Sequence, residues 1–199
     1  MKILCIGRNY VDHARELKNE IPDRPLIFMK PSTALFEGKK WHMPGFSEDV
    51  HYECEWVLRM GKNARNVDEE EALRFVDGMT LGIDFTARDI QSVLKKKGHP
   101  WERAKAFDGS AVVGEWQPFN PKPQQFSFYQ GEKLLQRGDT DLMIFKLPFL
   151  IHHLSQYFTL EPGDLIFTGT PQGVGRVEAS ASYAGFLGGK SVLSFEVEA

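Results

Sequence analysis

The sequence predicts an α+β domain that is rich in β-strands. Eight short runs have the composition of strands, while segments with the helical period are fewer and separate these runs. The 18 glycines and 11 prolines are spread along the chain rather than gathered in a linker. A length of 199 residues suits one domain over 1–199, and 42% hydrophobic with 26% charged residues is a globular composition.

The predicted strands are apolar or alternating runs between turn residues. Residues 192–197 alternate most clearly, which places Leu193, Phe195 and Val197 on one face. Gln130 and Gly131 are expected to form a tight hairpin turn between two of the runs. In chain order the predicted strands are 3–6, 26–29, 52–60, 79–85, 126–129, 133–135, 164–167 and 192–197.

Short helices are expected between the strands. They are predicted at 11–18, 69–76, 86–98 and 149–158. Thr86 is the expected start of the third helix. The three lysines at 95–97 lie at the C-terminal end of that helix, where cations complement the helix dipole. The simplest interpretation of these lysines is a solvated helix end.

Charge and hydropathy exclude several classes of protein. A formal charge of −3 without a basic excess argues against binding a nucleic-acid backbone. No run approaches the roughly 18 apolar residues that a membrane-spanning helix needs. The first apolar run stops at Gly7, too early for a signal peptide, so a cytoplasmic location is expected. Cys5 and Cys54 are expected to be reduced thiols, and one disulfide between them is the alternative.

Three acidic residues interrupt apolar strands. Glu53 and Glu55 are two residues apart, so in a strand they share a face, and Asp84 follows the apolar residues 79–83. Carboxylates on a buried face repel one another unless a cation joins them. Carboxylates without thiolate or imidazole favour a hard dication, Mg²⁺ or Mn²⁺. An exposed strand face for the glutamates and a helix-capping role for Asp84 are the alternatives.

Other candidate residues lie outside these strands. His13 and Glu16 are three residues apart in a predicted helix, where a paired histidine can take a proton from water; a surface pair is the alternative. Lys105 lies among small and aromatic residues, and its ammonium group suits a developing oxyanion; a side chain that reaches solvent is the alternative. Residues 168–175 form either an anion-binding turn or a plain glycine turn.

Taken together, these residues fall into ordered motifs. The motifs are Gly7-Arg8-Asn9-Tyr10, Lys30-Pro31-Ser32-Thr33, His51-Tyr52-Glu53-Cys54-Glu55, Gly82-Ile83-Asp84-Phe85-Thr86-Ala87-Arg88-Asp89, Lys105-Ala106-Phe107-Asp108 and Thr168-Gly169-Thr170-Pro171. Over nearly its whole length the chain resembles the fumarylacetoacetate hydrolase family, in its short single-domain branch. This branch includes acylpyruvate hydrolases, oxaloacetate decarboxylases and the isomerase/decarboxylase of homoprotocatechuate breakdown.

The resemblance implies a fold, a cofactor and a site. The implied fold is a mixed β-sandwich roll of the fumarylacetoacetate hydrolase C-terminal type with a few short helices, as a homodimer that binds Mg²⁺ or Mn²⁺. The implied metal ligands are Glu53, Glu55 and Asp84. The implied catalytic residues are His13 and Glu16, which activate water, and Lys105, which polarises the substrate oxygen. The implied substrate-binding residues are Arg8, Arg88, Gln91 and Thr170.

The resemblance also implies an enzyme. The predicted reaction is cleavage of the C–C bond of a 2,4-diketo acid, an acylpyruvate, to pyruvate and a carboxylic acid. The alternatives are oxaloacetate decarboxylation and the isomerisation and decarboxylation of 2-hydroxyhepta-2,4-diene-1,7-dioate. A silent binding protein on the same fold is a further alternative. The expected partner is a small 2-keto or 2,4-diketo acid, with no nucleic acid and no membrane.

Two departures from the family pattern concern the C-terminal part of the chain. Residues 177–186 replace a Gly-Asp element that family members usually carry before a charged strand. Gln172 stands where relatives often have Lys or Asp. Neither departure touches the expected metal ligands. They bear on substrate choice and on the pairing of the last strand.

Overall fold

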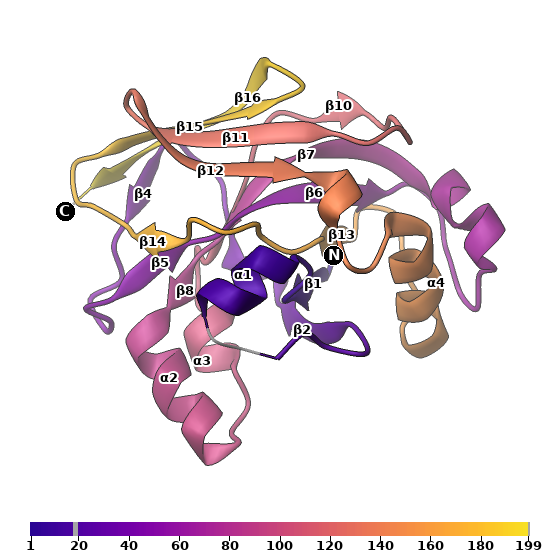
Figure 1. Cartoon of the computed structure of the whole chain (residues 1–199), viewed down its shortest axis with the longest axis horizontal. Helices are drawn as coiled ribbons and strands as arrows, with labels where there is room; N and C mark the ends of the chain where they lie inside the picture. The colour runs from indigo at the N-terminus through magenta and orange to yellow at the C-terminus, as the bar shows by residue number, and fades with distance from the viewer. Residues whose placement is uncertain (18–19, 199) are drawn as a thin grey trace.

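The computed structural model describes residues 1–17 and 20–198 (Figure 1). Its strands form sheets of eight, five and three strands, and short helices lie around them. In Figure 1 the five-stranded sheet runs along the top of the view, and the helices α2 and α3 lie at the bottom. The predicted β-rich α+β fold is confirmed. None of the helices in the described part of the chain is long and apolar enough to cross a membrane.

The eight-stranded sheet is the centre of the molecule. Its order is β2 (Leu26–Lys30), β1 (Ile3–Gly7), β13 (Leu165–Phe167), β6 (Cys54–Met60), β7 (Val76–Asp84), β9 (Ala111–Val113) and β3 (Leu35–Phe36), with β10 (Gln117–Pro118) paired to β7. The strands β6 and β7 are antiparallel neighbours, and β1 runs parallel to β13. Because β6 and β7 are almost fully buried, they read as continuous apolar runs rather than as alternating ones.

Two smaller sheets complete the fold. The five-stranded sheet has the order β12 (Lys133–Asp139), β11 (Gln125–Gln130), β15 (Ser182–Leu187), β16 (Lys190–Glu198) and β4 (Lys40–His42). The three-stranded sheet has the order β14 (Gly175–Arg176), β5 (Val50–Tyr52) and β8 (Thr86–Ala87). The predicted hairpin between β11 and β12 is present, with Gly131 in the left-handed region at φ 54°. The atypical segment at 177–186 enters β15, which pairs with β16 as an antiparallel strand with a register shift between Gly185 and Phe186.

The predicted strand at 52–60 is divided at Glu53. Before this residue β5 pairs with β8 and β14, whereas after it β6 pairs with β7 and β13. The chain therefore changes sheets at Glu53. An apolar pattern cannot show this division, because the residues on both sides of it are buried.

The first three predicted helices are shorter than expected, whereas the fourth, predicted at 149–158, begins two residues earlier and ends one residue earlier. The observed elements are α1 (Val11–Glu16), α2 (Arg88–Lys97), α3 (Glu102–Lys105), α4 (Leu147–Tyr157) and the 3-10 helices η1 (Ser32–Ala34), η2 (Glu69–Phe75) and η3 (Thr140–Leu142). The expected end of the first helix, Lys18, lies outside the described residues. Thr86 does not begin α2, because it pairs with His51 in the three-stranded sheet. The predicted helix at 69–76 is the 3-10 helix η2.

A stack of aromatic rings joins the five-stranded sheet to its neighbours. Phe128 of β11 stacks on Tyr183 of β15, with ring centroids 5.5 Å apart and planes 9° apart. Its ring also lies 5.4 Å from that of Tyr52 in β5 and 6.5 Å from that of Phe195 in β16. Because Phe128 is completely buried, this stack ties β5, next to Glu53, to the outer sheet.

We expect Phe128→Ala to lower the free energy of unfolding by about 3–5 kcal/mol, since it removes a buried ring and leaves a cavity. Urea titration followed by circular dichroism measures the change. Phe46→Ala is the matched control, because Phe46 is 55% exposed and should cost much less. Equal losses for the two variants would contradict the role of this stack.

Candidate active site

Three buried carboxylates come together where β5, β6 and β7 meet. Each of Glu53, Glu55 and Asp84 offers an oxygen within 4.8 Å of the others. The register of β6 and β7 places Glu55 opposite Gly82, and the Asp84 amide donates to the Glu53 carbonyl at 2.9 Å. The structure thus brings Asp84 to the two glutamates, which precede it by about 30 residues in the sequence, and so gathers the three predicted metal ligands.

Two lysines and an arginine face this carboxylate cluster. Lys105 Nζ lies 2.8 Å from Glu53 Oε2 and 2.7 Å from Asp84 Oδ2. Lys30 Nζ lies 2.7 Å from Asp84 Oδ1. On the opposite side of Glu53, Arg88 donates from Nη2 to Oε1 at 2.5 Å. Lys105 and Arg88 are where the sequence predicted them, inside the site. The predicted alternative, a Lys105 ammonium group in solvent, is wrong, since the side chain is buried.

Lys30 is a site residue that the sequence analysis missed. It ends β2 and is buried, and its ammonium group also donates to the Ser110 carbonyl at 2.9 Å and to Ser110 Oγ at 3.0 Å. It further donates to the carbonyl of Lys105. Lys30 therefore fixes both a carboxylate of the cluster and the backbone that carries Lys105. A lysine followed by proline at the end of an apolar strand was the available signal.

The cations compensate the three carboxylates unequally. Burial raises the pKa of the Glu53 carboxyl, but Lys105 and Arg88 outweigh burial and hold this pKa below its ordinary value. Burial also raises the pKa of Glu55, and the charges of Asp84 and Glu53 raise it further. The same two carboxylates outweigh burial at Lys105 and raise its pKa. Of the two glutamates, Glu55 is thus the one whose ionised form gains more from an added cation.

The cluster fits the hard dication that the sequence predicted. All three side chains offer oxygen ligands, and the spacing of these oxygens lets one ion contact all of them. Neither cysteine competes, because burial raises the pKa of the Cys54 thiol well above its ordinary value and does the same at Cys5. Both thiols are free and buried, as expected.

The helix α1 brings the predicted histidine to the cluster. His13 is 4% exposed, and its Nδ1 lies 3.2 Å from Glu16 Oε2. The Gly173 amide donates to the other carboxylate oxygen of Glu16 at 3.0 Å. Because Glu16 occupies Nδ1, the nitrogen left for proton exchange in the site is Nε2. Of this pair His13 is buried, whereas Glu16 is exposed, so the alternative of a surface pair holds for Glu16 and not for His13.

The glycine-rich turn at 168–175 holds carboxylates of this chain. Its Gly169 amide donates to Glu55 Oε2 at 2.7 Å, and Gly173 holds Glu16. Gly169 has φ +101°, and a Cβ there would lie 2.7 Å from Asn9 Cβ. Only glycine satisfies both the positive φ and this close approach. The turn therefore positions one expected metal ligand and the partner of His13.

A buried amide, Gln136 of β12, links the turn to the ligand strand and was also missed. Its Oε1 accepts from the Cys54 amide at 2.9 Å, and its Nε2 donates to Thr170 Oγ1 at 2.8 Å. The Thr170 hydroxyl in turn donates to the Cys54 carbonyl at 2.8 Å. Thr170 was expected to bind substrate, but its hydroxyl hydrogen is used within this ring. Both backbone groups of Cys54, which lies between two ligands, are fixed by these bonds.

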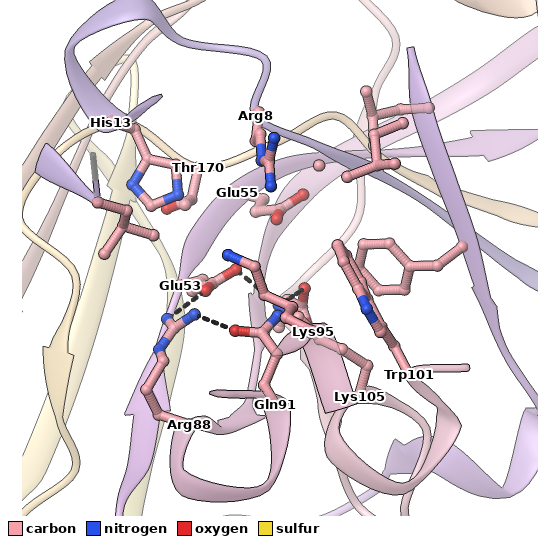
Figure 2. Close-up of a pocket in the computed structure, with 16 residues that line it drawn as sticks. Arg8, His13, Glu53, Glu55, Arg88, Gln91, Lys95, Trp101, Lys105 and Thr170 are labelled. Atoms are coloured by element: carbon pink, nitrogen blue, oxygen red, sulfur yellow. Dashed lines mark hydrogen bonds and ion pairs between the residues drawn. The ribbon is translucent and has the colours of Figure 1, made fainter. Parts of the chain in front are cut away.

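These side chains line a chamber of about 40 Å³. Figure 2 shows Arg8 above Glu55, Arg88 and Gln91 on the side of Glu53, and Trp101 beside Lys105. Of the ten predicted site residues, nine line the chamber, and Glu16 reaches it through His13. Gln172 is exposed and is not among the residues that line it.

A comparison with models of known protein families shows the family of this chain. The family model described as fumarylacetoacetate (FAA) hydrolase C-terminal matches residues 2–198. The chain belongs to this family. The resemblance inferred from the six motifs is therefore confirmed, and so is its strand-rich fold.

Relatives within the fumarylacetoacetate hydrolase family differ in reaction. The "Oxaloacetate tautomerase FAHD1, mitochondrial" of Bos taurus is 42% identical over 98% of this chain and 91% of its own length. Fumarylpyruvate hydrolase from Pseudomonas aeruginosa, solved with Mn²⁺ and pyruvate, has a TM-score of 0.94 at 36% identity, covering 100% of this chain and 89% of its own. A 5-carboxymethyl-2-hydroxymuconate delta-isomerase from Mycobacterium smegmatis has a TM-score of 0.86 at 32% identity, covering 99% of this chain and 78% of its own. These three relatives are thus named as enzymes of three kinds: tautomerase, hydrolase and isomerase.

We expect Glu55→Gln to weaken Mn²⁺ binding at least tenfold, because it removes a charged ligand from the cluster. Titration of Mn²⁺ followed by electron paramagnetic resonance measures this affinity. Without metal the variant should unfold at the same temperature as the wild type or higher, since Glu55 is repelled by its two neighbours. Glu132→Gln, at an exposed turn, is the control. Unchanged Mn²⁺ affinity in Glu55→Gln would refute the assignment of the ligands.

We expect Gln136→Leu to cost about 1–3 kcal/mol of stability and to weaken Mn²⁺ binding, because the buried Cys54 amide loses its acceptor. Thermal unfolding and the same Mn²⁺ titration measure the two effects. Gln124→Leu is the matched control: Gln124 is also buried, but its Nε2 donates to the Lys122 carbonyl at 2.7 Å, away from the site. If the two variants affected Mn²⁺ binding equally, Gln136 would have no particular role at the site.

Proposed function

We propose that this chain is a divalent-metal-dependent hydrolase that cleaves the C–C bond of 2,4-diketo acids, the acylpyruvates, giving pyruvate and a carboxylic acid. The observation that carries the proposal is the buried His13, which is paired with Glu16 and lies beside the carboxylate cluster. Cleavage by hydrolysis needs a base that activates water. His13 is a histidine in the chamber with a carboxylate on its far nitrogen, which is the arrangement a base requires.

Glu53, Glu55 and Asp84 would hold Mg²⁺ or Mn²⁺, which when bound supplies Lewis-acid polarisation of the keto acid. Around it the side chains of the chain orient the substrate. Arg88 Nη1 donates a hydrogen bond to Gln91 Oε1 at 2.7 Å. The guanidinium of Arg88 and the side-chain amide of Gln91 then face the carboxylate of the pyruvate half. The Lys105 ammonium group lies beside Glu53 and Asp84, where it stabilises negative charge on the 2-oxygen.

The proton steps belong to His13. Its Nε2 takes a proton from water, and the hydroxyl oxygen forms a bond to the distal carbonyl carbon. The bond between this carbon and C3 then breaks, and its electron pair remains on C3 of the pyruvate half. His13 returns the proton to C3, so the products are pyruvate and the carboxylic acid. Glu16 keeps Nδ1 protonated and stabilises the imidazolium that forms between these steps.

A second candidate is proton transfer on oxaloacetate, with decarboxylation as its companion. The 42% identity to an oxaloacetate tautomerase favours this candidate. In keto–enol exchange His13 would move a proton between C3 and the 2-oxygen, and no water would be consumed. Decarboxylation breaks the bond to the terminal carboxylate and needs neither water nor a base. An isomerase activity, as in the mycobacterial relative, would use the same proton transfer.

The proposal extends to the assembly and location of the protein. It includes one catalytic domain over 1–199, a homodimer, a small keto acid as partner and a cytoplasmic location. Light scattering of the purified protein tests the dimer directly. The bovine relative is named as mitochondrial, so fractionation of cells that produce this chain is the test of its location.

We expect His13→Ala to lower acylpyruvate hydrolysis by about 10²–10⁴, the usual contribution of a general base, while oxaloacetate decarboxylation falls far less. Glu16→Gln should act in the same direction more mildly, because a neutral amide still orients the imidazole. Steady-state rates with both substrates on the same Mn²⁺-loaded preparations measure the difference. His42→Ala, at a histidine 70% exposed in β4, is the control.

Two results would contradict this assignment. If His13→Ala left hydrolysis intact, another group would activate the water. If both reactions fell equally while the thermal unfolding temperature also fell, His13 would serve packing rather than proton transfer.

A further inference from the structure

Arg88, the first residue of α2, has a hydrogen-bond donor without an acceptor. A guanidinium carries five N–H groups, one of them on Nε. The Nη2 of Arg88 donates to Glu53 Oε1 at 2.5 Å, and its Nη1 donates to Gln91 Oε1 at 2.7 Å. Its Nε is buried and has no hydrogen-bond partner among residues 1–17 and 20–198. Because this atom is shielded from solvent, its acceptor has to be another group of the protein.

His51 of β5 has the complementary deficit, an acceptor without a donor. Its Nε2 lies 3.0 Å from Asp49 Oδ1. A carboxylate only accepts hydrogen bonds, so Nε2 carries the hydrogen, and in the neutral ring the lone pair is then on Nδ1. This Nδ1 is buried, and in the part of the chain that the structure describes no donor bonds to it. His51 therefore offers an acceptor that its other neighbours leave unused.

The sheet register brings these two side chains together. His51 pairs with Thr86 of β8, and the Arg88 amide donates to the Asp49 carbonyl at 2.8 Å. Alternate residues of an extended segment share a face, so His51 lies between Asp49 and Glu53 on one face. Arg88 lies on the same face, because it contacts Glu53. Burial lowers the pKa of His51, and the nearby charge of Arg88 lowers it further, which agrees with this placement.

A second cation next to His51, Arg176 of β14, is a weaker candidate for the missing donor. It pairs with His51 in the three-stranded sheet, but it is exposed and its guanidinium donates to the Glu48 carbonyl. Solvent can satisfy its remaining N–H groups, whereas the Nε of Arg88 has no such contact. Two unpaired buried atoms of opposite kind are costly, and one hydrogen bond between them satisfies both.

We infer that Arg88 Nε donates to His51 Nδ1 and that His51 is the positioning residue for the Arg88 guanidinium. The bond is not formed in this structure, and rotation of the two side chains closes it. With Glu53 and Gln91 on the other two nitrogens, the guanidinium is held at all three and presents its remaining N–H groups in one orientation. The consequence for catalysis rests on the proposed function, in which Arg88 faces the carboxylate of the pyruvate half.

Nuclear magnetic resonance of the ¹⁵N-labelled, Mg²⁺-loaded protein tests the bond directly, with and without pyruvate. A hydrogen bond from N–H to nitrogen gives a measurable coupling between the two nitrogens. We expect this coupling between Arg88 Nε and His51 Nδ1, together with a chemical shift of Nδ1 typical of a ring nitrogen without hydrogen. Arg176→Gln is the control and should keep both signals. A hydrogen on Nδ1, or no coupling in either state, overturns the inference.

Two substitutions of His51 separate positioning from packing. His51→Asn keeps an acceptor, because its amide oxygen is a δ atom as Nδ1 is, whereas the longer amide of His51→Gln replaces only the contact with Asp49. We expect His51→Gln to raise KM for acetylpyruvate, the simplest acylpyruvate, about tenfold with kcat within about twofold, since it weakens binding that is common to substrate and transition state. His51→Asn should stay within about threefold of the wild-type KM. His42→Gln, at an exposed histidine, is the control.

Equal values of KM in His51→Asn and His51→Gln would mean that His51 only fills space, which overturns the inference. The two variants should unfold at similar temperatures, because both lose the ring; a KM difference that merely follows a difference in unfolding temperature overturns it as well. If the wild type does not hydrolyse acetylpyruvate, the proposed function fails. Calorimetric titration of the Mg²⁺-loaded variants with pyruvate then makes the same comparison: weaker binding in His51→Gln than in His51→Asn supports the inference, and equal binding overturns it.

Discussion

The burial of three carboxylates within 4.8 Å of one another is the constraint on which the rest of this structure depends. Like charges in a low-dielectric interior are stable only when cations or hydrogen-bond donors surround them. Here the compensating groups come from β2, α2, α3 and the glycine-rich turn. Each of these segments is held in place partly by its contact with an acid, so the site and the fold stabilise each other.

The scaffold fixes backbone more than side chains. Gln136 and Thr170 bond the two backbone groups of Cys54, and Asn9 bonds the turn that carries Arg8. Lys30 holds the carbonyl of Lys105. With the backbone fixed at these points, the side chains between them need few rotamer changes to meet a ligand, which reduces the entropy lost on binding. The relatives in this family share the scaffold while they differ in reaction.

Many residues of the site could be predicted from the sequence, because their signals lie within short segments of the chain. Acids inside apolar strands stand out, as Glu55 does in β6, and His13 and Glu16 have a helical spacing. What the sequence could not show depends on long-range register. Lys30 contacts Asp84 although β2 and β7 are not neighbours in the central sheet, and Gln136 reaches β6 from the outer sheet. The strand β15 has a weak pattern, because Gly185 lies inside it, where its register with β16 shifts.

The hydrogen bond between Gln136 and the Cys54 amide limits how the hairpin of β11 and β12 can be exchanged among relatives. This hairpin lies on the outer sheet and resembles a peripheral module, yet its one buried amide accepts from the backbone between two ligands. Side chains alternate between the faces of a strand, so a shift of one residue in β12 would turn the amide away from Cys54. A chimera built from two family members therefore inherits a working ligand strand only when the grafted hairpin keeps both the amide and its register.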